Sequence, residues 1–403
     1  MTQHHHARWV HLLPALLAVL FVAACGSDSS GVGTGSGAPG QQPAPTRVLI
    51  SADMAAGLFT LPPNYALPFP SDVDDGIAIA LALNALTPEQ AGFRGLEVAG
   101  ISVTFGNNER DAQLAQTREL VHEMMGRTDI PVEGGAAGPL PPADPDAERD
   151  PCITPGVEMM ADQLALGPAA LFAFGPLTDL ACLVLAFPER AANITHVLAQ
   201  IGARPGEEYT LPNVQQPIRE AVDCCLWSVN VSLDVPAVEL ALSAPELSQA
   251  RWTIAPWHFV AATLLSTNRM AQLGGSRPEG EWLRRNSIAF QTFWLAAFNE
   301  AGIHPWDVTL VQYLMRPQDF ATQEVGWRIV DCRNPDDPLG RPTNTDCAGH
   351  GPTQFPLRDA EPAQLWLGNG DDQAIRPGLF IIDDFVSEEA RTRFLDTATA
   401  LAP

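Results

Sequence analysis

The sequence predicts an α/β fold in which an open, mostly parallel sheet is flanked by helices. Strand-like and helix-like segments alternate along the chain, and each is a short apolar run bounded by Gly, Pro or charged residues. Apolar residues make up 46% of the chain, which is enough to bury a large core. Alternation of this kind places parallel strands side by side and helices on both faces of the sheet.

The expected elements follow one another from residue 47 onward. The first four are a strand at 47–52, a helix at 74–86, a strand at 96–105 and a helix at 109–126. The pattern then repeats with a buried strand at 164–175, a helix at 176–189 and a strand at 194–203. Ligands bind beyond the carboxyl ends of such strands, where Asp53, Asn107 and Phe174 follow three of them.

Residues 1–24 predict a lipoprotein-type signal peptide. Arg8 precedes an apolar run that ends in small residues at Val22-Ala23-Ala24-Cys25, and this ending resembles the lipobox of bacterial lipoproteins. The run is shorter than the ~20 apolar residues that a membrane span needs. We therefore expect Cys25 to be lipidated, with an ordinary signal peptide and an incidental Cys as the alternative.

Residues 25–46 are rich in Gly, Ser and Pro, which predicts a flexible linker, and residues 47–403 are expected to form one α/β domain. Together these segments predict an exported protein anchored by lipid at the bacterial cell envelope, facing the periplasm or the cell surface. The lipid anchor is the one membrane contact that we expect. The oligomeric state is left open, and a homo-oligomer is one alternative.

Charge and cysteine content narrow the partners and the chemistry. The formal net charge of −24 disfavours binding to phosphate backbones, so we expect no nucleic acid partner. Besides Cys25, six cysteines remain, and an exported protein is expected to form disulfides. Cys332 and Cys347 bracket a polar loop and are the first pair that we expect; this loop lacks the spacing of a calcium loop. The pairing of the other four is left open.

Acidic residues crowd the start of the helix at 74–86. Asp72, Asp74 and Asp75 lie within four residues, and Asp53 ends the preceding strand. Helix capping explains one or two of these carboxylates. A hard cation such as Ca²⁺ or Mg²⁺ would neutralise the whole group, and a solvated acidic turn is the alternative.

Several motifs resemble the calcium-dependent, inosine/uridine-preferring nucleoside hydrolases. Residues 95–140 follow that family's order of strand, Gly-Asn, helix, Gly-Arg-x-x-Ile-Pro-Val and Gly-Ala. FGPLTDLACLVLAFPE resembles its Gly-Pro-Leu-Thr-Asn helix start, with Asp179 replacing the Asn. WSVNVSLDVPAVELAL and HPWDVTLVQYL resemble two further segments, and the likeness covers most of residues 47–320. It implies a nucleoside hydrolase-like, Rossmann-like fold.

The resemblance implies a role for each matching residue. Asp53, Asp75 and Asp307 would bind Ca²⁺ through their side chains and Phe174 through its backbone carbonyl. Asp53 would also be the general base that deprotonates the attacking water. Asp74, Asn107 and Asn230 would hold ribose hydroxyls.

Departures from the family pattern concern the substrate. Ser51 replaces an Asp, Ser228 stands where a Glu usually contacts the sugar, and Trp306 stands where many members carry a His that protonates the leaving base. Trp306 can stack on a base but cannot donate that proton. An insertion that includes LFTLPPNYALPFP separates Asp53 from Asp74 and predicts an ordered flap near the site. His304 is expected to be a structural or exposed residue, with substitution for the missing proton donor as the alternative. Core or loop-packing positions are expected for Trp227, Trp252, Trp257, Trp282 and Trp294.

We therefore expect a secreted, divergent member of this family that hydrolyses the N-glycosidic bond of a ribonucleoside or related N-riboside by means of a Ca²⁺-activated water. The alternative is a lipoprotein that binds a ribosyl compound or another polyol without cleaving it.

Overall fold

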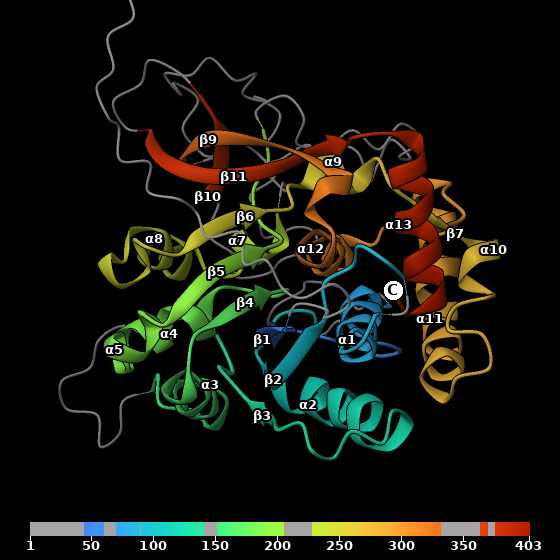
Figure 1. The fold of residues 1–403 in the computed structure, drawn as a ribbon, viewed down its shortest axis with the longest axis horizontal. Helices are drawn as coiled ribbons and strands as arrows, with labels where there is room; N and C mark the ends of the chain where they lie inside the picture. The colour runs from blue at the N-terminus through green and yellow to red at the C-terminus, as the bar shows by residue number, and fades with distance from the viewer. Residues whose placement is uncertain are drawn as a thin grey trace, which may run out of the picture. The chain divides into compact units, whose positions relative to one another are not determined.

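A nine-stranded sheet runs through the computed structural model, which describes residues 44–59, 70–88, 90–140, 151–204, 228–331, 363–369 and 375–403 (Figure 1). The strand order is β10-β9-β11-β6-β5-β4-β1-β2-β3. Their bounds are β1 Thr46–Ala52, β2 Leu96–Val103, β3 Val132–Gly134, β4 Ala169–Ala173, β5 Ile194–Ala199, β6 Arg251–Ile254, β9 Phe320–Asp331, β10 Ala363–Gly368 and β11 Arg376–Phe385. A separate antiparallel pair joins β7 (Leu265–Ser266) and β8 (Gly302–Ile303).

The part of the sheet from β3 to β11 is parallel. β1 lies in its middle, paired with β2 on one side and with β4 on the other. The core strands are continuous apolar runs, as expected for strands that helices cover on both faces; all five residues of β4 are buried. Their carboxyl ends therefore meet at one edge, which is where the polar residues after β1, β2 and β4 lie.

Helices cover both faces of this sheet (Figure 1). One face packs against α1 (Asp74–Asn84), the π-helical segment η1 (Glu119–Met124), α9 (Trp257–Ala261), α11 (Pro278–Phe298), α12 (Trp306–Met315) and α13 (Glu388–Ala400). The other face packs against α3 (Pro155–Leu166), α4 (Thr178–Ala186), α5 (Pro188–Ala191) and α8 (Val235–Ser243). Shorter or peripheral helices are α2 (Arg110–Arg118), α7 (Val229–Ser232), η2 (Pro245–Leu247), α10 (Thr267–Met270) and η3 (Pro317–Asp319). The expected open α/β sheet is confirmed.

The segment after residue 320 extends the sheet with antiparallel strands. β11 pairs in parallel with β6 and antiparallel with β9, which in turn pairs with β10. α13 then returns along the α1 face, where Gln312 donates to the Phe394 carbonyl at 2.8 Å and Asn84 donates to the Leu401 carbonyl at 2.8 Å. No motif in the sequence predicted these strands.

One boundary expectation is wrong. Residues 164–166, expected at the start of a buried strand, instead end α3, and the strand begins at Ala169. The start of α3 carries a recognisable signal, because Thr154 caps Val157 N–H through its side chain and Pro155 occupies the first turn. Within the described part of the chain, the apolar helices are too short to cross a bilayer.

Candidate functional site

Asp53 lies at the carboxyl end of β1, between the segments that follow the neighbouring strands β2 and β4. Its side chain is buried, and Asp53 Oδ2 accepts from the Asn107 N–H at 3.0 Å. A Cβ at Gly175 would come within 2.8 Å of Asp53 Oδ1, and one at Gly106 would overlap the same carboxylate. Glycine is therefore required after β2 and after β4 because the Asp53 carboxylate occupies the space between them.

Two helix N-termini converge on Asp53. Asp74 and Asp75 lie in the first turn of α1, and Asp307 lies in the first turn of α12. Asp75 Oδ1 accepts from the Asp53 N–H at 3.1 Å, and Asp74 Oδ2 accepts from the Asp307 N–H at 3.1 Å. The positive ends of both helix dipoles favour negative charge at this point. Residues separated by more than 200 positions are thereby brought together.

Asp72 adds a further carboxylate, which the acidic pattern included but the ligand set implied by the resemblance did not. Carboxylate oxygens of Asp72, Asp74 and Asp75 lie within 4.8 Å of one another, and Asn107 Nδ2 lies 3.5 Å from Asp72 Oδ1. The sequence showed Asp72 beside the pair, but capping explained it equally well. We call Asp53, Asp72, Asp74, Asp75 and Asp307 the carboxylate cluster.

Burial disfavours negative charge throughout the carboxylate cluster. It raises the pKa of Asp53 to about 7, an effect that the Asn107 N–H opposes and the Asp74 charge reinforces. Burial, followed by the charges of neighbouring carboxylates, raises the pKa of Asp72, Asp75 and Asp307 well above the ordinary value. Burial also raises the pKa of Asp74, although the Asp307 N–H opposes it.

The carboxylate cluster fits a hard cation. Asp307 Oδ1 is buried and has no hydrogen-bond partner among the described residues. No Arg, Lys or His of the described chain forms an ion pair with any member of the cluster. All of the donor atoms are oxygens, which Ca²⁺ and Mg²⁺ prefer.

Phe174, Asn230 and Gln200 extend the site along the ends of β4 and β5. The Phe174 carbonyl accepts from Asn230 Nδ2 at 2.6 Å, and the same nitrogen lies 3.1 Å from the Gln200 carbonyl. A carbonyl oxygen has a second lone pair, so the Phe174 carbonyl can also bind a cation. The Asn230 amide group thus holds the Phe174 carbonyl in place. Gln200 was not singled out from the sequence.

Trp306 is packed among other aromatic rings. Its ring is stacked on Trp257 with 5.5 Å between centroids and meets Trp294 edge-on at 5.7 Å. Only 7% of Trp306 is exposed, and its Nε1 has no partner among the described residues. Contact of Trp306 with a nucleobase stays a prediction.

His304 occupies a structural position. Its Nδ1 lies 2.6 Å from the Thr263 carbonyl and its Nε2 lies 2.8 Å from Glu300 Oε2. Both ring nitrogens therefore face acceptors, and neither is directed to a substrate. This arrangement supports the expectation that His304 is structural; Trp252, Trp282 and Trp294 are likewise buried.

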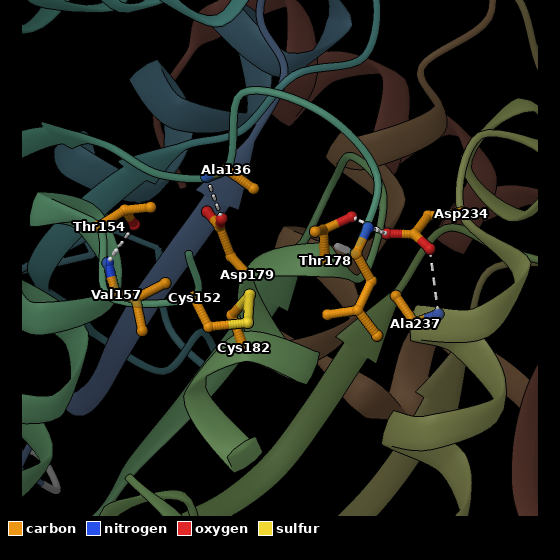
Figure 2. Close-up of a disulfide and its surroundings, with 10 residues drawn as sticks. Ala136, Cys152, Thr154, Val157, Thr178, Asp179, Cys182, Asp234 and Ala237 are labelled. Atoms are coloured by element: carbon orange, nitrogen blue, oxygen red, sulfur yellow. Dashed lines mark hydrogen bonds between the residues drawn. A yellow bond between two sulfur atoms is a disulfide. The ribbon is translucent and has the colours of Figure 1, made fainter. Parts of the chain in front are cut away.

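A second polar region surrounds the start of α4 (Figure 2). Asp179 of α4 accepts from Ser102 Oγ at 2.6 Å, the Ala136 N–H at 2.7 Å and Ser51 Oγ at 3.3 Å. Asp179 and Ser51, two of the four positions that depart from the family pattern, are therefore in contact.

The Asp234 carboxylate likewise accepts hydrogen bonds from neutral donors. It accepts from the Leu140 N–H at 2.7 Å, Thr178 Oγ1 at 2.5 Å and the Ala237 N–H at 3.1 Å, the last contact capping α8. We call Asp179 and Asp234 the structural pair.

The disulfide in Figure 2 joins Cys152 and Cys182, a pairing that the sequence left open. It ties the segment before α3 to α4. The expected Cys332–Cys347 pair, Cys224, Cys225, Trp227 and the lipidation site Cys25 lie outside the described residues.

The base of the insertion after Asp53 lies beside the site. Phe59 and Pro70 form an antiparallel bridge, and the Ser71 N–H donates to the Leu58 carbonyl at 2.9 Å. The side chain of Asn108, next to Asn107, donates to the Phe59 carbonyl. The insertion therefore starts and ends next to the loop that holds Asp53, while residues 60–69 lie outside the described part.

Comparison with known sequences identifies relatives. Residues 70–349 match the family described as inosine-uridine preferring nucleoside hydrolase. The chain is 25% identical over 308 residues to the non-specific ribonucleoside hydrolase RihC of Salmonella paratyphi B, an alignment that covers 68% of this chain and 89% of that protein. The pyrimidine-specific ribonucleoside hydrolase RihA of Shewanella woodyi is 31% identical over 151 residues, which is 32% of this chain and 45% of that protein.

Solved structures share the fold. A plant nucleoside hydrolase superposes with a TM-score of 0.59 at 17% identity, covering 88% of this chain and 99% of that one. An inosine-guanosine nucleoside hydrolase superposes with a TM-score of 0.58 at 16% identity, covering 89% of this chain and 98% of that one. At these identities the likeness bears on the fold alone.

Proposed function

Because the chain belongs to the inosine-uridine preferring nucleoside hydrolase family, we propose that it hydrolyses the N-glycosidic bond of a ribonucleoside with Ca²⁺ at the carboxylate cluster. Membership makes it a hydrolase of N-glycosyl compounds, and its named relatives act on ribonucleosides. Asp53 precedes the range matched to the family, so its assignment depends on the geometry described above.

The observation that supports the metal most directly is the buried, unpartnered Asp307 Oδ1 within a group of carboxylates that lacks a cationic side chain among the described residues. Asp53, Asp75 and Asp307 would hold the ion together with the Phe174 carbonyl. We favour calcium over magnesium because calcium accepts about 6–8 oxygen ligands in flexible geometries. Bound calcium supplies positive charge that makes a nearby water more acidic and offsets the repulsion between the carboxylates.

Side chains of the protein carry out the proton transfer and stabilise the developing charge. The Asp53 carboxylate accepts a proton from the water as its oxygen bonds to the anomeric carbon. The bond between that carbon and the base nitrogen breaks, and its electron pair leaves with the base, which takes up a proton from solvent water. Positive charge develops on the sugar, as in glycoside hydrolysis, and the surrounding carboxylates stabilise it.

Substrate contacts complete the proposal. Asp74, Asn107 and Asn230 would hold ribose hydroxyls, and Trp306 would lie against the base. The backbone N–H of Asn107 orients the Asp53 carboxylate, and this contact does not depend on whether the Asn107 side chain reaches the sugar.

A panel of purine and pyrimidine ribonucleosides tests this function. The chelator-treated protein should release no reducing sugar, and added calcium should restore release from at least one nucleoside. Release that is unaffected by chelation would contradict the metal assignment. No release with any nucleoside, with calcium bound, would instead support a non-catalytic lipoprotein that binds a ribosyl compound or another polyol, which Ser228 and Trp306 favour.

The location is also a proposal. The lipobox-like ending at Cys25 supports a lipid-anchored protein at the bacterial cell envelope. Mass spectrometry of the mature N-terminus should find a lipidated Cys25, and an unmodified or different N-terminus would contradict the anchor. Whether the protein forms a homo-oligomer is testable by light scattering.

A further inference from the structure

The Gln200 carboxamide contains a buried donor without a partner. Gln200 directly follows β5, and only 6% of it is exposed. Its Nε2 is buried and has no hydrogen-bond partner among the described residues. Leaving such a donor unpaired costs stability, so a buried unpaired group in a folded protein calls for a physical explanation.

The other end of the same carboxamide fixes its orientation. Asn230 Nδ2 lies 2.6 Å from the Phe174 carbonyl and 3.1 Å from the Gln200 carbonyl, so this atom of Asn230 must be the amide nitrogen. The Gln200 atom 3.3 Å from Asn230 Nδ2 is therefore the acceptor Oε1, and Nε2 is the atom that points elsewhere.

The unpaired nitrogen lies next to the active site. The two polar atoms of a carboxamide are about 2.2 Å apart, so Gln200 Nε2 lies no more than about 6 Å from Asn230 Nδ2. Asn230 in turn contacts the carbonyl proposed as a calcium ligand. Gly175, the residue after Phe174, packs so closely against Asp53 that a Cβ there would come within 2.8 Å of Asp53 Oδ1.

We propose that Gln200 is a substrate-binding residue whose Nε2 donates a hydrogen bond to a ribose hydroxyl. The proposal depends on the function proposed above. Ser228 stands where the resemblance implies a Glu that contacts the sugar, and Gln200 places a polar group beside Asn230. A sugar hydroxyl is a suitable occupant because its oxygen can accept the bond while its own proton goes to a neighbouring acceptor.

The test combines Gln200→Met, which keeps the length of the side chain but removes the donor, with ribonucleosides that lack one hydroxyl. On the full ribonucleoside, kcat/KM should fall by about 10- to 100-fold. On the 2′-, 3′- or 5′-deoxy analogue that lacks the contacted hydroxyl, the same substitution should change kcat/KM less than about twofold, because that bond is already absent. Gln200→Asn keeps the carboxamide but places it one methylene closer to the backbone, out of reach of the hydroxyl. It serves in the same comparison if the Met variant does not fold.

Equal losses on the full nucleoside and on all three analogues would overturn the proposal, since a residue that only supports Asn230 would act on every substrate alike. No loss on any substrate would overturn it as well. Calcium affinity of the variant should stay within about threefold of wild type.

A binding measurement separates this proposal from the proposed function. If the wild type cleaves no nucleoside, D-ribose and its deoxy derivatives are titrated calorimetrically into the calcium-loaded protein. Weaker ribose binding by Gln200→Met, with no weakening for one deoxyribose, would support Gln200 without hydrolysis. Equal ribose binding by the two proteins, or none by the wild type, would overturn the role of Gln200.

Discussion

Two groups of carboxylates, all buried except the half-buried Asp72, lie near the same edge of the sheet, and their hydrogen-bond partners differ. Each member of the structural pair accepts at least three hydrogen bonds from hydroxyl or backbone N–H donors. Within the carboxylate cluster, the described donors are backbone N–H groups and the Asn107 amide, and other carboxylates lie nearby.

The difference separates a structural carboxylate from a binding one. Neutral donors can stabilise one buried negative charge at a time, which suffices for Asp179 and for Asp234. Several carboxylates within a few ångströms repel one another, and their raised pKa values record that repulsion on top of burial. A bound cation would offset this repulsion. Calcium should therefore stabilise the carboxylate cluster and have no effect on the structural pair.

The largest expected effect is on catalysis. Asp53→Asn removes the proposed base, and kcat should fall by about 10³-fold or more. The exposed Asp111→Asn serves as a matched control and should be unchanged; the Asp111 side chain is 82% exposed. Steady-state kinetics on the best nucleoside measures this effect, and retention of more than about a tenth of the wild-type kcat would remove Asp53 from the mechanism.

The next largest effect is that removing calcium with a chelator should reverse the direction in which the free energy of unfolding changes with pH. In the calcium-free protein the folded pKa of Asp53 is about 7 against 3.8 for an ordinary Asp, so the folded state binds more protons between these values. Its free energy of unfolding should therefore fall as pH rises from about 4 to about 7, by up to about 4 kcal/mol. Urea unfolding at several pH values measures the trend.

With calcium bound, the carboxylates are ionised in the folded state, and stability should instead be lost as pH falls. The same slope with and without calcium would argue against a cation at the carboxylate cluster.

Asp307→Asn should act in two opposite directions. Calcium affinity should fall by about 100-fold, while the calcium-free variant should be more stable than calcium-free wild type because a repelling charge is removed. Asp179→Asn should lower stability equally with and without calcium. Calorimetry and thermal unfolding with chelator measure the two quantities. A destabilised calcium-free Asp307→Asn would contradict the repulsion argument.

The smallest effect concerns the structural pair alone. Asp234→Ala removes the cap of α8 and should lower the free energy of unfolding by about 1–2 kcal/mol. Calcium affinity should not change by more than about twofold. A calcium affinity that falls with this substitution would show that the structural pair and the carboxylate cluster are energetically coupled, which contradicts their separation.

The sequence predicted the fold and most of the site because their signals are local. Asp53 follows an apolar strand and Asp74-Asp75 open an apolar helix, so each carried its own pattern. Asp307 was reached through resemblance, since nothing local connects α12 to β1.

The remaining features depend on contacts across the fold. Gln200 looks like one polar residue after a strand, and its partner Asn230 is 30 positions away. The Cys152–Cys182 pairing needs the approach of α4 to the segment before α3, at a Cα–Cα distance of 4.7 Å. Asp72 could not be separated from a capping residue until its distance to Asp74 and Asp75 was known.

Calorimetric titration of Ca²⁺ into the chelator-treated protein tests the central claim most directly, with the Asp75→Asn, Asp307→Asn double variant as the comparison. We expect one calcium ion per wild-type chain and no binding by the double variant over the same concentration range. No binding by the wild type, or equal binding by the double variant, would contradict the assignment of the carboxylate cluster as a cation site.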